Sequence, residues 1–142
     1  MSLKHCGQGQ RGASAVEFAL VLPLLVTFLV GVVDLSLALY NKWVLTQASW
    51  DAVRAGIVLR SPKLTAAEIA AVAVERSSPL LVTLGGSSTP TVAVTPTTGG
   101  GAFGTPLSVT VTFAYKGLLL GSLISPSTGT LTLSGSTSMN NE

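Results

Sequence analysis

Residues 11–40 read RGASAVEFALVLPLLVTFLVGVVDLSLALY, and this stretch decides most of the fold. From Phe18 to Tyr40 there is one charged side chain, Asp34, and a helix of this length reaches about 34 Å. The hydrocarbon core of a bilayer is about 30 Å thick. The stretch therefore predicts a transmembrane helix over residues 13–40. The positive charge before it indicates a cytoplasmic N-terminus and an extracytoplasmic remainder.

Three residues of this segment are unusual for a membrane helix. Glu17 stands at its start, where a carboxylate needs a partner. Pro23 removes one helical hydrogen bond, and it is either a functional kink or an ordinary membrane-helix proline. Asp34 either pairs within the membrane or the assembly, or it lies in water because the hydrocarbon ends near Val33.

The helical pattern continues through NKWVLTQASWDAVRAGIVLR, residues 41–60. It predicts one continuous helix from about Ala13 to Val58. Trp43 and Trp50 are expected in the core or in an interfacial belt. Small residues recur every four positions, which lets another backbone pack closely. These small residues are Ala48, Ala52 and Gly56.

The remainder predicts a small α+β domain. Thr65 and Glu68 form a capping-box pattern that predicts a second helix over residues 66–76. Alternating apolar and polar residues then predict about three antiparallel strands. The strands are expected at residues 91–95, 107–115 and 130–137. The apolar loop from Leu118 to Ile124 is expected either to contact a partner or the membrane, or, as we favour, to be buried against the second helix.

Composition excludes several functional classes. The chain has 142 residues, of which 47% are apolar and only 10% charged, with one His and one Cys. These two, His5 and Cys6, cannot build a disulfide or a multi-histidine metal site, so no cofactor or metal is expected. The eight basic residues are scattered, which argues against nucleic acid as a partner. Paired carboxylates and phosphate loops are absent, and we expect neither an enzyme nor a small-molecule substrate.

The junction before the apolar helix is the most informative motif. A cut after Gly12 would free the α-amine of Ala13, four positions before Glu17 on the same helix. This amine would neutralise the Glu17 carboxylate, on its own chain or on a neighbouring one. Pairing between chains would fix their stagger.

GASAVEF, residues 12–18, followed directly by an apolar helix, resembles the type IV prepilin processing site. More narrowly, RGASAVEFALVLPLL resembles the start of TadE-like proteins, the minor pseudopilins of the tight-adherence (Flp, type IVb) pilus system. The likeness extends to the helix around residues 48–56, to the strand-rich part and to residues 138–142.

The resemblance implies that a prepilin peptidase cuts between Gly12 and Ala13 and that Glu17 serves processing or assembly. Residues 1–12 would then be a leader, and residues 41–142 an extracytoplasmic domain. The helix would hold the protein in the bacterial inner membrane and pack with other pilins and minor pseudopilins. The protein would be a peptidase substrate that does no chemistry itself.

Two other functional classes remain. One is an unprocessed single-pass membrane protein whose outer domain binds a ligand or a partner. The other is a secreted protein cut after Ala38, although its apolar region would be much longer than that of a usual signal peptide.

Removal of residues 1–12 would leave six basic and six acidic side chains, so the formal charge of +2 belongs to that segment.

Overall fold

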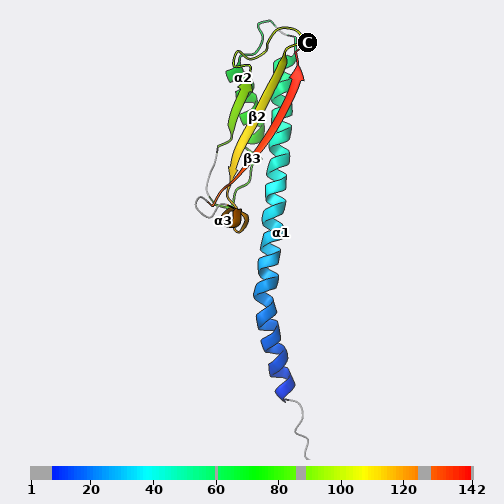
Figure 1. Cartoon of the computed structure of the whole chain (residues 1–142), viewed down its shortest axis with the longest axis vertical. Coiled ribbons are helices and arrows are strands. Elements are labelled where there is room, and N and C mark those ends of the chain that lie inside the picture. Colours follow the sequence, from blue (N-terminus) through cyan, green and yellow to red (C-terminus); the bar gives the residue numbers. More distant parts are fainter. Residues whose placement is uncertain (1–7, 60, 86–88, 125–128, 142) are drawn as a thin grey trace, which may run out of the picture.

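The computed structural model describes residues 8–59, 61–85, 89–124 and 129–141. Its longest element is α1 (Gln8–Ile57), a helix of 50 residues that projects far beyond the rest of the molecule (Figure 1). The other elements are α2 (Ala66–Ser77), β1 (Thr91–Thr95), β2 (Pro106–Tyr115), α3 (Leu120–Ile124) and β3 (Leu131–Asn140). This confirms the predicted α+β class. We call residues 12–33 the projecting helix and residues 34–141 the head.

The three strands form one antiparallel sheet in the order β1-β2-β3. Val92 faces Val111 in the first pair, and Phe113 faces Leu133 in the second. Every second residue of β2 is buried, as its alternating pattern predicts. The buried residues are Leu107, Val109, Val111, Phe113 and Tyr115. The other face carries short hydroxyl side chains, so only one face of the sheet needs a cover.

Two helices cover the apolar face of the sheet. The C-terminal half of α1 contributes Leu45 and Val53 to the core, and α2 returns alongside it to contribute Ile69 and Ala73 (Figure 1). Gly56 makes this approach close, because a Cβ there would lie 2.7 Å from Ile69 Cδ1 and 2.6 Å from Leu107 Cδ2. The core of the head therefore lies between the two helices and β2.

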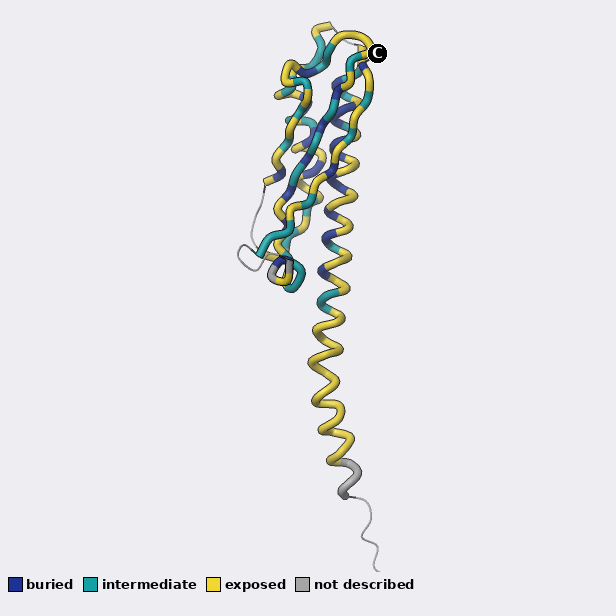
Figure 2. The backbone as a smooth tube through the Cα atoms, viewed as in Figure 1, coloured by how far each residue is buried: buried dark blue, intermediate teal, exposed yellow. Residues whose placement is uncertain are grey.

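Burial changes abruptly along α1 (Figure 2). Every residue from Gly12 to Leu29 is exposed, and the first fully buried residue is Asp34. Beyond it, buried residues recur at spacings of three and four, the period of a helix with one buried face. The same helix is thus unsupported before Asp34 and part of a folded core after it.

The start of α2 has the predicted capping box. The Thr65 N–H donates to Glu68 Oε2 at 2.8 Å, and the Glu68 N–H donates to Thr65 Oγ1 at 3.4 Å. These bonds satisfy two backbone donors that the start of a helix would leave without partners.

Three boundaries differ from the predictions. α1 begins at Gln8 rather than near Ala13, because extending a formed helix costs little and residues 8–12 contain no proline. β3 continues to Asn140 and pairs with β2 along its whole length, rather than ending near residue 137. The expected loop after β2 contains the short helix α3. The N–H group of its first residue donates to the Asp34 carboxylate on α1.

Candidate functional site

The projecting helix is the largest feature that the fold leaves without support. Helix α1 is long and apolar enough to cross a membrane, and its most apolar 18-residue window has none of its residues buried by the head. Its exposed side chains include Phe18, Leu20, Leu24 and Phe28. So long an apolar surface is unfavourable in water, and it indicates contact with lipid or with other helices.

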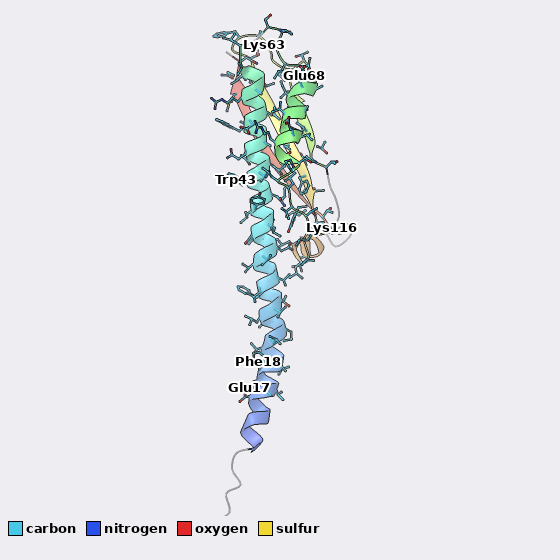
Figure 3. All side chains as sticks on the ribbon, turned by 180° about the vertical axis from the view of Figure 1, so that it is seen from behind. Glu17, Phe18, Trp43, Lys63, Glu68 and Lys116 are labelled. Carbon is cyan, nitrogen blue, oxygen red and sulfur yellow. The ribbon has the colours of Figure 1, made fainter. Side chains whose placement is uncertain are left out.

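The residues of the predicted processing motif lie at the far end of this helix. Figure 3 shows Glu17 and Phe18 well away from the head, and Gly12, Ala13 and Glu17 are all exposed. A Cβ at Gly12 would meet no atom within 4 Å. A peptidase or a neighbouring helix could therefore reach this motif without disturbing the head.

Pro23 lies inside α1, and the helix continues through it. Thr27 Oγ1 donates a hydrogen bond to the Pro23 carbonyl at 2.8 Å. A hydroxyl that bonds to the carbonyl one turn earlier can remain in hydrocarbon, because its donor is satisfied within the helix.

Asp34 marks the junction between the projecting helix and the head. Its side chain is fully buried and accepts the Tyr115 hydroxyl at 2.5 Å. The N–H groups of Leu119 and Leu120 each donate to Asp34 Oδ2 at 2.9 Å. A Cβ at Gly117 would overlap this carboxylate, so glycine makes room for it. Of the two alternatives for Asp34, the one in which it is simply hydrated is wrong, because groups of its own chain enclose it.

This junction links distant parts of the sequence. The carboxylate caps the start of α3, where backbone N–H groups lack helical partners, and it also binds the last residue of β2. Burial and the hydrogen bond to Asp34 raise the pKa of Tyr115 well above its usual value. The phenol therefore keeps its proton at neutral pH and remains a donor.

A second polar contact holds α1 about two helical turns after Asp34. Buried Asn41 donates through Nδ2 to the Val82 carbonyl at 2.6 Å and accepts the Val82 N–H at 2.9 Å. The chain after α2, which contains Val82, also reaches the end of β2, where the Leu84 N–H donates to the Lys116 carbonyl at 3.1 Å. One face of α1 is thus bonded to the chain after α2 and to the chain around α3.

Of the two places expected for Trp43 and Trp50, the structure excludes the core, and it contradicts the favoured expectation for the apolar loop. Trp43 and Trp50 are both substantially exposed, so neither belongs to the core. The Arg54 guanidinium carbon lies 5.4 Å from the centre of the Trp50 ring. Leu118 is 61% exposed and Leu123 is 73% exposed, so the favoured expectation that they are buried against the second helix is wrong. The N–H groups of Leu119 and Leu120 bind Asp34, so this segment is held against α1 instead of α2.

The small residues of α1 face the inside of the head. Ala48 and Ala52 are buried, and Gly56 contacts α2 and β2 as described above. Ala48 also borders an open pocket of about 310 Å³ between α1 and the end of α2, which Trp43, Glu75 and Arg76 help to line. The small-residue ridge therefore packs within this chain.

In the part of the chain that the structure describes, no three His, Cys, Asp or Glu side chains come together in a way that could hold a metal ion. The expectations for His5 and Cys6 lie outside the described residues.

Comparison with known proteins identifies the N-terminal segment. Residues 12–54 match the family described as TadE, TadE-like protein. The match covers the projecting helix and most of the part of α1 that lies in the head, and it confirms the resemblance inferred from RGASAVEFALVLPLL. The match concerns this N-terminal part of the chain, and it is consistent with a TadE-like protein of the tight-adherence pilus system. The resemblance of the strand-rich part lies outside the matched residues and stays a prediction. No curated protein and no solved structure matches the chain.

Proposed function

Because its projecting helix belongs to a TadE-like segment, we propose that this protein is a membrane-anchored minor pseudopilin of a tight-adherence pilus system. A prepilin peptidase removes residues 1–12, α1 crosses the bacterial inner membrane, and the head lies outside the cytoplasm. The protein acts as an assembly subunit and not as an enzyme.

The observation that carries this proposal is the combination of the family match with the exposure of residues 12–29. An apolar helix without cover from its own head has its whole circumference available to lipid and to neighbouring pilin helices. Glu17 lies at the end of that surface, where cleavage would place a new α-amine four residues away. The contacts of Asp34 and Asn41 hold the head firmly on the same helix.

The length of the mature chain tests the processing step. The intact mass of protein extracted from the membranes of cells with an active prepilin peptidase should correspond to a chain that starts at Ala13. Gly12→Val should block the cut, because a branched side chain would occupy the residue just before the cleaved bond. Gly31→Val is the matched control, since Gly31 lies on the same helix and a Cβ there meets no atom within 4 Å. Retention of residues 1–12 in the wild-type protein would contradict the proposed processing.

Glu17 tests the assembly step separately. Glu17→Gln keeps the size of the side chain but removes its charge, so membrane insertion should be unchanged while incorporation into the pilus machinery falls several-fold. Co-purification with the other pilins, compared at equal membrane abundance, measures this. Asp51→Asn, a charge removal on the head part of α1, is the control. Equal co-purification of the Glu17→Gln variant and the wild-type protein would remove Glu17 from this role.

A further inference from the structure

We propose that α3 forms a second membrane contact, in which Leu118 and Leu123 enter the outer leaflet beside α1. The proposal rests on the membrane insertion of α1 proposed above. It adds that the head lies partly in lipid. The hydrocarbon region then extends along α1 beyond Asp34 instead of ending before that residue.

The first support is the position of α3 against α1. The N–H groups of Leu119 and Leu120 bind the Asp34 carboxylate, so α3 lies at the level where α1 leaves the head (Figure 1). Leu118 and Leu123 are nevertheless 61% and 73% exposed. The segment from Gly117 to Ile124 carries no charged residue. An uncharged turn with outward leucines is therefore continuous with the apolar surface of the projecting helix.

The second support is the length of the apolar helix. The uncharged run from Phe18 to Val33 has 16 residues and spans only about 24 Å, short of the hydrocarbon thickness of about 30 Å. Filling that thickness from Phe18 takes about 20 residues and reaches Leu37. The outer boundary of the hydrocarbon then lies about one helical turn beyond Asp34 along α1. The hydrocarbon therefore extends at least to the level of α3.

The third support is that the polar side chains in this stretch are already hydrogen-bonded within the protein. From Phe18 to Leu39 the polar side chains are those of Thr27, Asp34 and Ser36. Thr27 donates to the Pro23 carbonyl, and Ser36 donates to the Val32 carbonyl at 2.7 Å. The Asp34 carboxylate is enclosed by Tyr115 and α3. Burial under α3 removes the penalty that an exposed carboxylate would have at this depth.

The charge pattern places the end of the apolar zone beyond Asp34. On the face of α1 away from the head, Leu35, Leu39 and Tyr40 are exposed, and the first charged residue is Lys42. Lys116, just before α3, is also exposed, and Figure 3 shows it at the lower end of the head. Both lysines can extend their ammonium groups towards lipid headgroups while their methylene chains remain in apolar surroundings.

Nitroxide labels on the full-length chain in phospholipid vesicles test this contact. Cys6→Ser removes the native thiol, and single cysteines replace Leu123, Leu24 or Phe103 in turn. Leu24 lies in the projecting helix, whereas Phe103 is 87% exposed on a loop far from α3. Power saturation then compares collisions with oxygen, which concentrates in lipid, and with a water-soluble nickel chelate. The ratio of oxygen to nickel collisions should be several-fold higher at Leu123 than at Phe103, and closer to the ratio at Leu24.

The three sites separate the possible failures. A lipid signal at Leu24 with a water signal at Leu123 would overturn the α3 contact and leave the membrane anchor in place. A water signal at Leu24 would overturn the anchor itself. Shielding of Leu123 from both reagents, at a dilution that leaves most vesicles with one chain, would indicate burial in protein and also overturn the proposal. A cysteine at Leu118 provides an independent second reading of α3.

Discussion

Replacing Gly135 with alanine is expected to destabilise the head by about 3 kcal/mol, the upper end of the usual cost of overpacking. Gly135 lies in β3, and a Cβ there would lie 2.6 Å from the Leu45 carbonyl carbon and 2.6 Å from the Thr46 nitrogen. Both obstacles are backbone atoms of α1, which cannot rotate away as a side chain can. The helix and the strand would have to separate along the contact that closes the core.

Thermal unfolding of the detergent-solubilised protein, followed by circular dichroism, measures this effect. For a domain of this size the expected loss corresponds to a fall of roughly 10–20 °C in melting temperature. Ser134→Ala is the matched control, because it changes the neighbouring residue on the exposed face of the same strand. It should alter the stability by less than about 0.5 kcal/mol. Equal melting temperatures of the two variants would mean that β3 and α1 are not in backbone contact.

Local patterns in the sequence were sufficient for most of the fold. The alternation in residues 107–115 identified β2 and its buried face, because the period of a strand is two. Thr65 and Glu68 identified the start of α2, because a capping box needs only those residues at that spacing. The apolar run after Glu17 identified the projecting helix. Each of these features depends on neighbours within a few positions of the chain.

The junction at Asp34 could not be predicted in the same way, because its partners are more than 80 residues away. Each of the two partner residues nevertheless carried a signal in the sequence. Asp34 is the one charge within its apolar run, and Tyr115 is the one residue on the buried face of β2 with a hydroxyl that needs a partner. Pairing the two would have required the packing of α1 against β2. The short helix α3 was missed for the same reason, since the carboxylate that caps it belongs to another element.

Replacing Asp34 with alanine is expected to cost about 3 kcal/mol and to release α3 from α1. The change removes the carboxylate that accepts from the Tyr115 hydroxyl and from the N–H groups of Leu119 and Leu120, and it leaves Tyr115 only its longer bond, 3.3 Å, to the carbonyl of residue 34. Each buried donor without a partner costs about 1–3 kcal/mol, and relief from burying a carboxylate offsets part of the sum. Tyr115→Phe removes only one of the donors and keeps the cap of α3, so its cost should be smaller, about 1.5 kcal/mol, the lower end for a hydrogen bond to a charged group.

Hydrogen exchange at the amides of Leu119 and Leu120 distinguishes these two variants. Both amides should be protected in the wild-type protein and in Tyr115→Phe, because the Asp34 carboxylate still accepts their hydrogen bonds. In Asp34→Ala their exchange should accelerate far more than that of the amides in the middle of β2, which keep their ladder partners. A local loss at α3 with an intact sheet is the signature of a missing cap, whereas uniform loss would indicate general unfolding.

Asp51→Ala is the control for removing a carboxylate from α1, because Asp51 lies on the same helix within the head and away from α3. It should leave exchange at Leu119 and Leu120 unchanged. Unchanged exchange in Asp34→Ala as well would show that α3 forms without the carboxylate, and the junction would then rest on apolar packing alone. Accelerated exchange in Asp34→Ala alone would make Asp34 the residue that couples the projecting helix to the head, because an acceptor on α1 then holds both the end of β2 and the start of α3.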